Sequence, residues 1–249
     1  MPVDPQLASA AADLLVMKLR IRDEVSDEEA AVLRDSISEI RDYGPGRTIV
    51  RSGVTLTESN LLFDGLVCRF KDMLDGERQI MELHVAGDFV DLHSFVLKRI
   101  EHNIGSLTAA RFAIVPHEAL RRITEGWPHL ARLLWFSTLL DSAIHREKII
   151  TVGRRSASAR IAHLFCELYL RLQTVGLAAD LRYHLPLTQA DLADASGLTS
   201  VHVNRMLKEL RDAGLVTFRG SEVVIHDWEG LQQAAEFSPS YLYLERRER

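Results

Sequence analysis

Cysteine is scarce in this 249-residue sequence, which contains only Cys68 and Cys166. Two distant cysteines exclude a disulfide-stapled scaffold and a Cys-x-x-Cys metal site, so we expect both to be small buried apolar side chains. No uninterrupted run of about 18 apolar residues occurs, and no membrane span is expected. The first residues lack a basic stretch followed by an apolar one, so we expect no signal peptide and a cytoplasmic location.

An excess of positive charge is also missing, because the net charge is -5. The acidity lies in the first half: residues 1–128 carry 15 Lys/Arg and 21 Asp/Glu, whereas residues 129–249 carry 15 and 14. The second half is therefore compatible with DNA binding, but its nearly balanced charge does not by itself indicate it.

Signatures of catalysis and metal binding are absent from the sequence. It contains no GxxxxGK[ST], no GxSxG and no HExxH, and its histidines form no His-x-His pair. We expect no catalytic residue, no metal ligand and no cofactor, and interpret His84, His93, His102 and His117 as surface or structural residues. The alternative is a metal- or small-molecule-binding jelly-roll protein that acts as a sensor without binding DNA.

The first half of the chain changes from a helical to a strand-like pattern. Residues 5–42 are predicted to be helical, and Ser26 with Glu29 forms a capping box. From Tyr43 on, short runs are separated by glycine, and Asp75-Gly76 suits a tight hairpin turn. Several short strands at this spacing predict a sandwich or barrel of the jelly-roll type over about residues 30–125.

A long helix is predicted after Pro128, since apolar residues recur at helical spacing and no Pro or Gly intervenes until Gly153. About 25 residues give about 37 Å of helix. One small domain cannot bury both flanks of this apolar stripe, so we expect the helix to pair with its copy in a second chain. The alternative is a long core helix of a monomer. The predicted dimer interface comprises Leu130, Leu133, Leu134, Leu140 and Ile144.

The most informative segment covers residues 187–227. Thr188 and Thr199 are expected to cap two short helices, and Asp191 completes a pattern that resembles a capping box. Ala193 is small enough for a close helix crossing, and Gly197 four residues later suits the tight turn. This spacing predicts a helix-turn-helix, whose second helix enters the major groove of DNA. The alternative is an ordinary helical hairpin in a core.

The second of these helices is predicted to bury Val203, Met206 or Leu207, and Leu210, so its other face points outward. Arg205 is the best base reader there, because its guanidinium can bond O6 and N7 of guanine together. Two strands around Gly220-Ser221 are expected to add a wing. The predicted base-reading residues are Ser200, Val201, Asn204 and Arg205, and the predicted DNA-backbone contacts are Thr188, Gln189, Thr199, His202, Lys208 and Arg219.

Over about residues 30–230 the chain resembles the Crp/Fnr family of bacterial regulators. The resemblance rests on a glycine-punctuated β-roll, the turn Gly87-Asp88-Phe89, the long helix and the winged helix-turn-helix. It implies an α+β fold and a homodimer that binds a palindromic site in double-stranded DNA and recruits or blocks RNA polymerase. Arg205 falls on the family's guanine-reading arginine. Val201 stands where members often carry a glutamate, and since valine can contact only a thymine methyl, we expect an altered half-site.

The predicted domains are residues 1–127 with the N-terminal helices and β-roll, 128–153 with the dimerisation helix, and 154–249 with the winged helix-turn-helix. Asp91-Leu92 and His102-Asn103 stand where cyclic-nucleotide-binding members carry Gly-Glu and Arg-Ser, so a cyclic nucleotide is not expected. Cys68 alone cannot hold the iron–sulfur cluster of the oxygen-sensing branch. We expect a different effector, or none and control by protein abundance.

Overall fold

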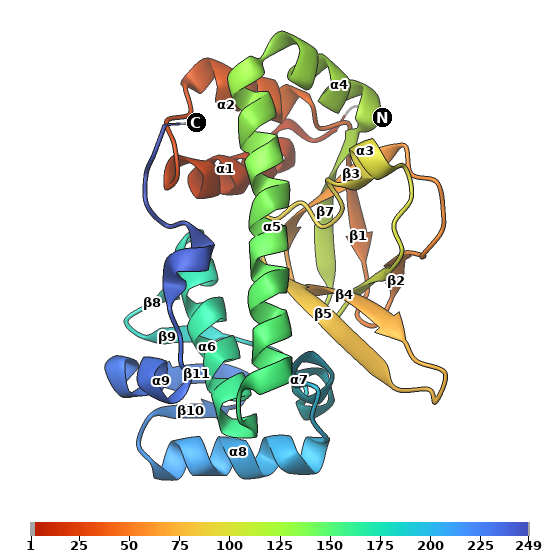
Figure 1. Cartoon of the computed structure of the whole chain (residues 1–249). Helices are drawn as coiled ribbons and strands as arrows, with labels where there is room; N and C mark the ends of the chain where they lie inside the picture. Colours follow the sequence, from red (N-terminus) through yellow and green to blue (C-terminus); the bar gives the residue numbers. More distant parts are fainter. Residues whose placement is uncertain (1–2, 249) are drawn as a thin grey trace. The chain divides into compact units, whose positions relative to one another are not determined.

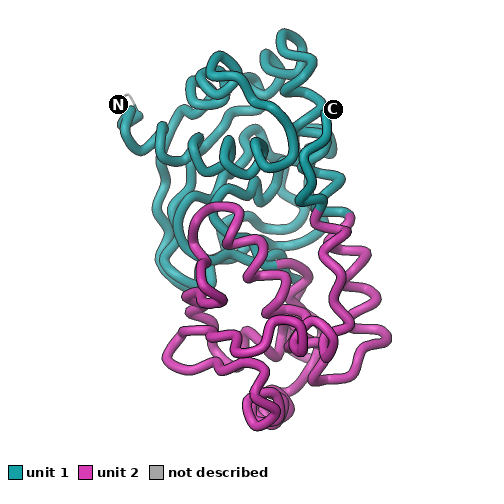
Figure 2. The backbone as a smooth tube through the Cα atoms, turned by 90° about the vertical axis from the view of Figure 1, so that its left-hand side faces the viewer, with its two compact units in different colours: residues 1–70, 83–142, 243–249 teal, residues 71–82, 143–242 magenta. Residues whose placement is uncertain are grey.

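The computed structural model describes residues 3–248 and divides the chain into two compact units (Figures 1 and 2). The first unit contains residues up to 70, residues 83–142 and the chain from 243 on, and the second contains residues 71–82 and 143–242. The division thus falls inside the long helix, which differs from the predicted boundaries at 127/128 and 153/154. Residues 71–82, which the sequence places in the β-roll, belong to the second unit.

Two helices begin the first unit. Helix α1 (Pro5–Arg20) starts behind Asp4, whose side chain accepts the Gln6 N–H, and α2 (Asp27–Asp35) starts with the predicted capping box of Ser26 and Glu29. The predicted helical region was too long, because Glu39–Tyr43 forms strand β1. That strand pairs with β7 (Ala110–Pro116), so sheet hydrogen bonds replace helical ones there.

Two antiparallel sheets form the predicted β-roll. One has the order β1-β7-β3, with β3 at Glu58–Asp64, and the other the order β2-β6-β4-β5, from Thr48–Val50, Asn103–Ser106, Val67–Asp72 and Arg78–His84. Buried side chains from both sheets, such as Leu62, Val67, Ile104 and Phe112, share one core. The loop between β4 and β5 covers residues 73–77, with only Gly76 at positive φ, and is therefore longer than the tight turn predicted at Asp75-Gly76.

The long α5 (Pro128–Arg154) agrees closely with the predicted long helix. The short α3 (Ser94–Leu97) lies between β5 and β6 in the chain, α4 (His117–Gly126) follows β7, and α6 (Ala157–Gln173) follows α5 behind the capping residue Ser156. Cys68 and Cys166 are both buried free thiols, as expected, and burial raises the pKa of Cys166 to about 12. No helix among residues 3–248 is long and apolar enough to cross a membrane.

The predicted dimer interface on α5 is wrong for four of its five residues. Leu130 and Leu133 are 0% exposed and Leu134 and Ile144 nearly so, because they pack against other parts of their own chain. Leu140 is only half-buried. The hydrophobic spacing identified a stripe correctly, but that stripe faces the protein's own core. The exposed apolar residues of α5 are Trp135, Leu139, Ile149 and Ile150.

The second unit ends in a compact arrangement of short elements. A four-stranded sheet has the order β10-β11-β9-β8, formed by Val216–Arg219, Glu222–Ile225, Arg182–His184 and Ala178–Ala179. Helices α7 (Gln189–Ser196) and α8 (Ser200–Asp212) lie between β9 and β10 in the chain, and α8 packs on α6 and α7. Helix α9 (Trp228–Ala234) and a 3₁₀ helix (Pro239–Leu242) complete the unit.

Candidate nucleic-acid interface

The two helices of the predicted motif begin and end where their capping residues require. Thr188 accepts the Asp191 N–H at 3.1 Å and donates its own N–H to the Asp191 carboxylate at 3.0 Å, which confirms the capping box. Helix α7 ends at Gly197, whose left-handed φ of 62° a residue with a side chain rarely adopts. Thr199 then accepts the His202 N–H at the start of α8. The sequence therefore specifies this turn locally.

Helix α8 has one buried and one exposed face, as predicted. Val203, Met206 and Leu210 are buried, whereas Leu207 is only half-buried. The opposite face is exposed, and Val201 reaches 80% exposure. The exposed side chains of this face are Ser200, Val201, His202, Asn204, Arg205 and Lys208. A 13-residue helix that presents such a face to solvent has the dimensions of an element that fits the major groove.

Three exposed cations on α8 and β10 have no partner among residues 3–248. Arg205 and Lys208 extend from α8, and Arg219 ends strand β10; no hydrogen bond or ion pair of these side chains occurs within the described chain. Gly220 and Ser221 both have positive φ and connect β10 to β11 by a two-residue turn, which confirms the predicted wing. Guanidinium and ammonium groups in this situation are available to phosphate or to guanine.

Other predicted contact residues already bond within the protein. The side chains of Gln189 and Asn204 exchange two hydrogen bonds of 2.6 Å each, from Nε2 to Oδ1 and from Nδ2 to Oε1. The Thr188 hydroxyl donates to Asp191 at 2.6 Å, and the Thr199 hydroxyl lies 3.3 Å from Nδ1 of His202. Of these six side chains, all except that of Asp191 are exposed, so these bonds shape the surface that DNA would meet.

Helix α7 is held by ion pairs that sequence reasoning missed. The Arg78 guanidinium bonds Asp191 at 2.8 Å and Asp194 at 2.7 Å, and the Gln79 amide donates to the Asp194 carbonyl at 2.8 Å. The partners of Arg78 lie 113 and 116 residues further along the chain, so no local pattern could have indicated the pairs.

The carboxyl end of α7 is also covered by cations. Lys148 of α5 donates to the Ala195 carbonyl, and Arg160 of α6 donates to the Ser196 carbonyl at 3.3 Å. Carbonyls at the end of a helix carry partial negative charge, so positive side chains stabilise them there. Burial lowers the pKa of Lys148. Together with Arg78, these contacts leave α7 little freedom to move.

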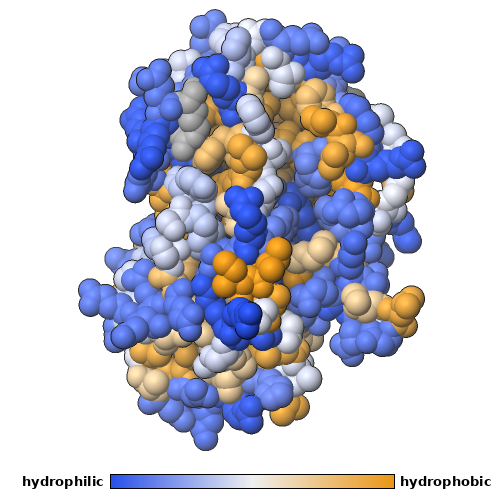
Figure 3. All heavy atoms as spheres, viewed as in Figure 1, coloured by the Kyte–Doolittle hydropathy of each residue, from blue (hydrophilic) through white to orange (hydrophobic). Residues whose placement is uncertain are grey.

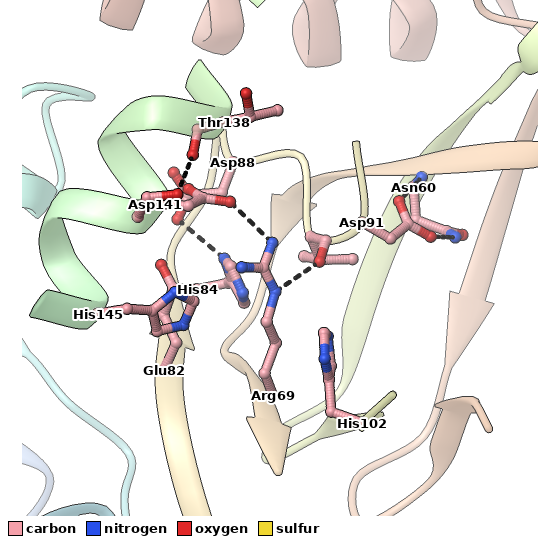
Figure 4. Close-up of polar contacts among 12 residues, drawn as sticks. Asn60, Arg69, Glu82, His84, Asp88, Asp91, His102, Thr138, Asp141 and His145 are labelled. Atoms are coloured by element: carbon pink, nitrogen blue, oxygen red, sulfur yellow. Dashed lines mark hydrogen bonds and ion pairs between the residues drawn. The ribbon is translucent and has the colours of Figure 1, made fainter. Parts of the chain in front are cut away.

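In the first unit, by contrast, the buried charged residues Arg69 and Asp91 bond within the protein (Figure 4). Arg69 is only 2% exposed; its Nε donates to the Val90 carbonyl at 2.9 Å and its Nη2 to Asp141 at 2.8 Å. Asp91 is buried and accepts both the N–H and the side-chain amide of Asn60, at 2.6 Å each. Burial raises the pKa of Asp91 to about 6, against the lowering effect of these hydrogen bonds.

The residues at the positions that bind a cyclic nucleotide in other proteins have protein partners too. His102 lies 3.1 Å from Glu101, and the Asn103 side chain accepts the Ser52 N–H at 3.0 Å. His117 contacts the hydroxyls of Ser59 and Ser94, and burial lowers its pKa. Within residues 3–248, no group of three or more His, Cys, Asp or Glu side chains is placed to hold a metal ion.

The chain is similar to known transcription regulators. Residues 159–234 match the Crp-like helix-turn-helix domain. The chain is 25% identical over 213 residues to the transcriptional activator protein FnrL of Cereibacter sphaeroides. This match covers 84% of this chain and 85% of FnrL. It is 27% identical over 198 residues to the nitrogen fixation regulation protein FixK of Bradyrhizobium diazoefficiens, and this match covers 77% of this chain and 80% of FixK. The solved structure of FixK2 from Bradyrhizobium japonicum shares the fold, with a TM-score of 0.73, 23% identity and coverage of 80% and 98%.

Proposed function

Because this chain belongs to the Crp/Fnr family of DNA-binding transcription regulators, we propose that it acts as a homodimer that reads a palindromic site with the exposed face of α8. One observation carries the proposal. Arg205 stands exposed on that face without a partner among residues 3–248, where its guanidinium can bond O6 and N7 of guanine.

The neighbouring side chains set the rest of the proposed half-site. Val201, one helical turn before Arg205, offers only apolar surface, which suits a thymine methyl and cannot accept a bond from cytosine. Ser200 offers a hydroxyl at the first turn of α8. Lys208 and Arg219 suit phosphate, and the amino-terminal ends of α7 and α8, with Thr188, Gln189, Thr199 and His202, suit the same role.

The proposed dimer interface lies on the exposed stripe of α5. Trp135, Leu139, Ile149 and Ile150 fall within an arc of about 100° around the helix at about 100° per residue. Figure 3 shows an apolar patch over the lower part of α5, with hydrophilic side chains directly above it. A stripe of this width suits pairing of two copies around a two-fold axis, which would match a palindromic site.

Sedimentation of a double variant tests the dimer. Leu139→Asp with Ile150→Asp should give monomers that no longer bind a palindrome, because four like charges, two from each chain, would be buried at the interface. Val96→Asp, at an exposed apolar residue away from α5, is the control and should leave the dimer intact. A dimer that persists in the double variant would exclude this stripe as the interface.

We further propose that the regulator has no catalytic role, works in the cytoplasm beside RNA polymerase, and does not respond to a cyclic nucleotide. The last point is supported by Arg69 and Asp91, which are buried with protein partners, so neither side chain is available to a cyclic nucleotide. Titration calorimetry with millimolar cyclic AMP or cyclic GMP should show no binding heat; saturable heat would contradict the proposal.

Selection from random duplex DNA tests the proposed function as a whole. The purified full chain should enrich a palindrome in which each half-site contains the same invariant guanine. The centres of the two half-sites should lie one turn of the DNA helix apart, about 34–36 Å. Binding should weaken steeply with salt, because phosphate contacts release counterions. No enrichment at low salt, in a preparation shown to be folded, would overturn the function.

A further inference from the structure

Gln189 and Asn204 form a closed pair on the surface that would face DNA. Gln189 is the first residue of α7, and Asn204 lies on the exposed face of α8, directly before Arg205. Their two hydrogen bonds run in opposite directions, so the two amides close a ring in which each donates once and accepts once. Both bonds are short, at 2.6 Å.

A primary amide has only one edge that carries a donor and an acceptor side by side. That edge combines the oxygen with the N–H on the same side, and it is the edge with which asparagine reads N6 and N7 of adenine. A ring between two amides uses the same edge on both partners. Asn204 therefore cannot read adenine in this way while it is paired with Gln189.

The surroundings of Gln189 keep the pair in place. Arg78 bonds both Asp191 and Asp194 on α7, and Lys148 and Arg160 bond the carbonyls at the end of that helix. Because α7 cannot shift easily, Gln189 stays where it meets Asn204. Each amide of the ring keeps one N–H that points away from the ring, and such a donor fits a phosphate oxygen.

We propose that Gln189 occupies the adenine-reading edge of Asn204 and thereby makes Asn204 a positioning residue rather than a base reader. The pair braces α8 against α7 and offers its outward N–H groups to one phosphate, while sequence preference falls to Arg205 and Val201. The inference rests on the proposed function, since it concerns how the same surface reads DNA.

Parallel DNA selections with the full-length protein test this proposal. Asn204→Ala should select the same half-site as the parent, with affinity lowered uniformly by up to about tenfold. Gln189→Ala should release the amide edge, so an adenine preference should appear at one base pair of each half-site and disappear again in the Gln189→Ala/Asn204→Ala double variant. Gln233→Ala, at an exposed glutamine of α9, is the matched control and should select as the parent does.

The outcomes separate this inference from the proposed function. If Asn204→Ala relaxes an adenine preference that the parent has, or if Gln189→Ala selects the parental half-site unchanged, the inference fails while the function stands. If the parent selects no sequence, the proposed function fails first. Both residues are exposed, and parental thermal unfolding of each variant would show that a change in selection does not reflect loss of fold.

Discussion

Arg69 and Arg205 show how differently the two units use the same side chain. Arg69 is buried in the first unit and bonds the Val90 carbonyl and Asp141. Arg205 is exposed in the second unit and has no partner among residues 3–248. Desolvating a guanidinium is costly unless its donors are satisfied, so Arg69 is tied to its own protein, whereas Arg205 is available to another molecule.

The comparison extends to the surroundings of each arginine. In the β-roll, the buried Asp91 carboxylate accepts two hydrogen bonds from Asn60, so neither side chain is free to bind a charged ligand. In the helix-turn-helix, the inward contacts involve α7, and the outer face of α8 keeps its cations exposed. Arg69 and Asp91 of the first unit therefore serve its internal structure, whereas Arg205 and Lys208 of the second unit are exposed to solvent.

Removing Arg69 should have the largest effect on stability. Arg69→Ala breaks the ion pair with Asp141, removes the bond to the Val90 carbonyl and opens a cavity, so we expect the free energy of unfolding to fall by about 3–5 kcal/mol. Urea unfolding followed by circular dichroism measures this loss. Arg121→Ala, which removes an exposed pair with Glu118, is the control and should change stability little. A loss as small as the control's would mean that Arg69 is not structural.

The pH dependence of stability should reveal the buried Asp91. Because burial raises its folded-state pKa to about 6 from an ordinary value of 3.8, the folded protein retains a proton that the unfolded chain releases. Its contribution to stability is therefore full below about pH 4 and is lost as the pH rises through 6, on the order of 2–3 kcal/mol. Asn60 and Arg69 lower this pKa and Glu58 raises it.

Urea unfolding of the parent and of Asp91→Asn between pH 4 and 7 measures that contribution. The variant cannot titrate, so its stability should fall less than the parent's over this range. Asp42→Asn is the control: the side-chain hydrogen bond from Arg111 lowers the pKa of Asp42 below its ordinary value of 3.8, so its contribution is lost only below about pH 4 and this variant should run parallel to the parent between pH 4 and 7. Parallel curves for the parent and Asp91→Asn would contradict the assignment.

Arg205→Ala should weaken specific DNA binding without affecting stability. We expect a loss of about 1–3 kcal/mol in binding free energy and a relaxed preference at one base pair of each half-site. Titration against the selected palindrome and its single-base variants measures both. Lys208→Ala is the matched control, since loss of a phosphate contact should weaken all sequences equally and reduce the salt slope by about one. Parental affinity in Arg205→Ala would refute the proposed readout.

Thr199→Ala should have the smallest effect. The Thr199 hydroxyl caps α8, and its loss should lower the free energy of unfolding by about 1 kcal/mol. Thermal unfolding measures this change. Thr199→Ser retains the capping oxygen and should restore most of the loss; an equal loss in both variants would show that packing of the methyl group, rather than capping, is responsible.

Several features could be predicted because neighbouring residues decide them. The side chains of the capping residues Ser26, Thr188 and Thr199 each accept a backbone N–H three residues further along the chain. Gly197 adopts a positive φ because it has no side chain. The outward face of α8 followed from the 3.6-residue period alone. These interactions depend on short sequence separations, and the sequence displays them directly.

Other features depended on which surfaces meet in three dimensions. Periodicity found the apolar stripe of α5, but only the fold shows that Leu130 and Leu133 lie in the chain's own core while Trp135 and Leu139 stay exposed. Residues 39–42 form a strand because β7 pairs with them. The pair between Gln189 and Asn204 joins residues 15 positions apart on two crossing helices, and a helical pattern says nothing of such a contact.

By itself, the order of amino acids determined the helix-turn-helix, its wing and the exposed arginine at 205, since caps, turns and amphipathic periods act over a few residues. Tertiary structure alone decided which carboxylates bond Arg78, which face of α5 is exposed and which side chain pairs with the amide of Asn204. Contacts between distant segments depend on packing of the whole chain, and no local pattern encodes them.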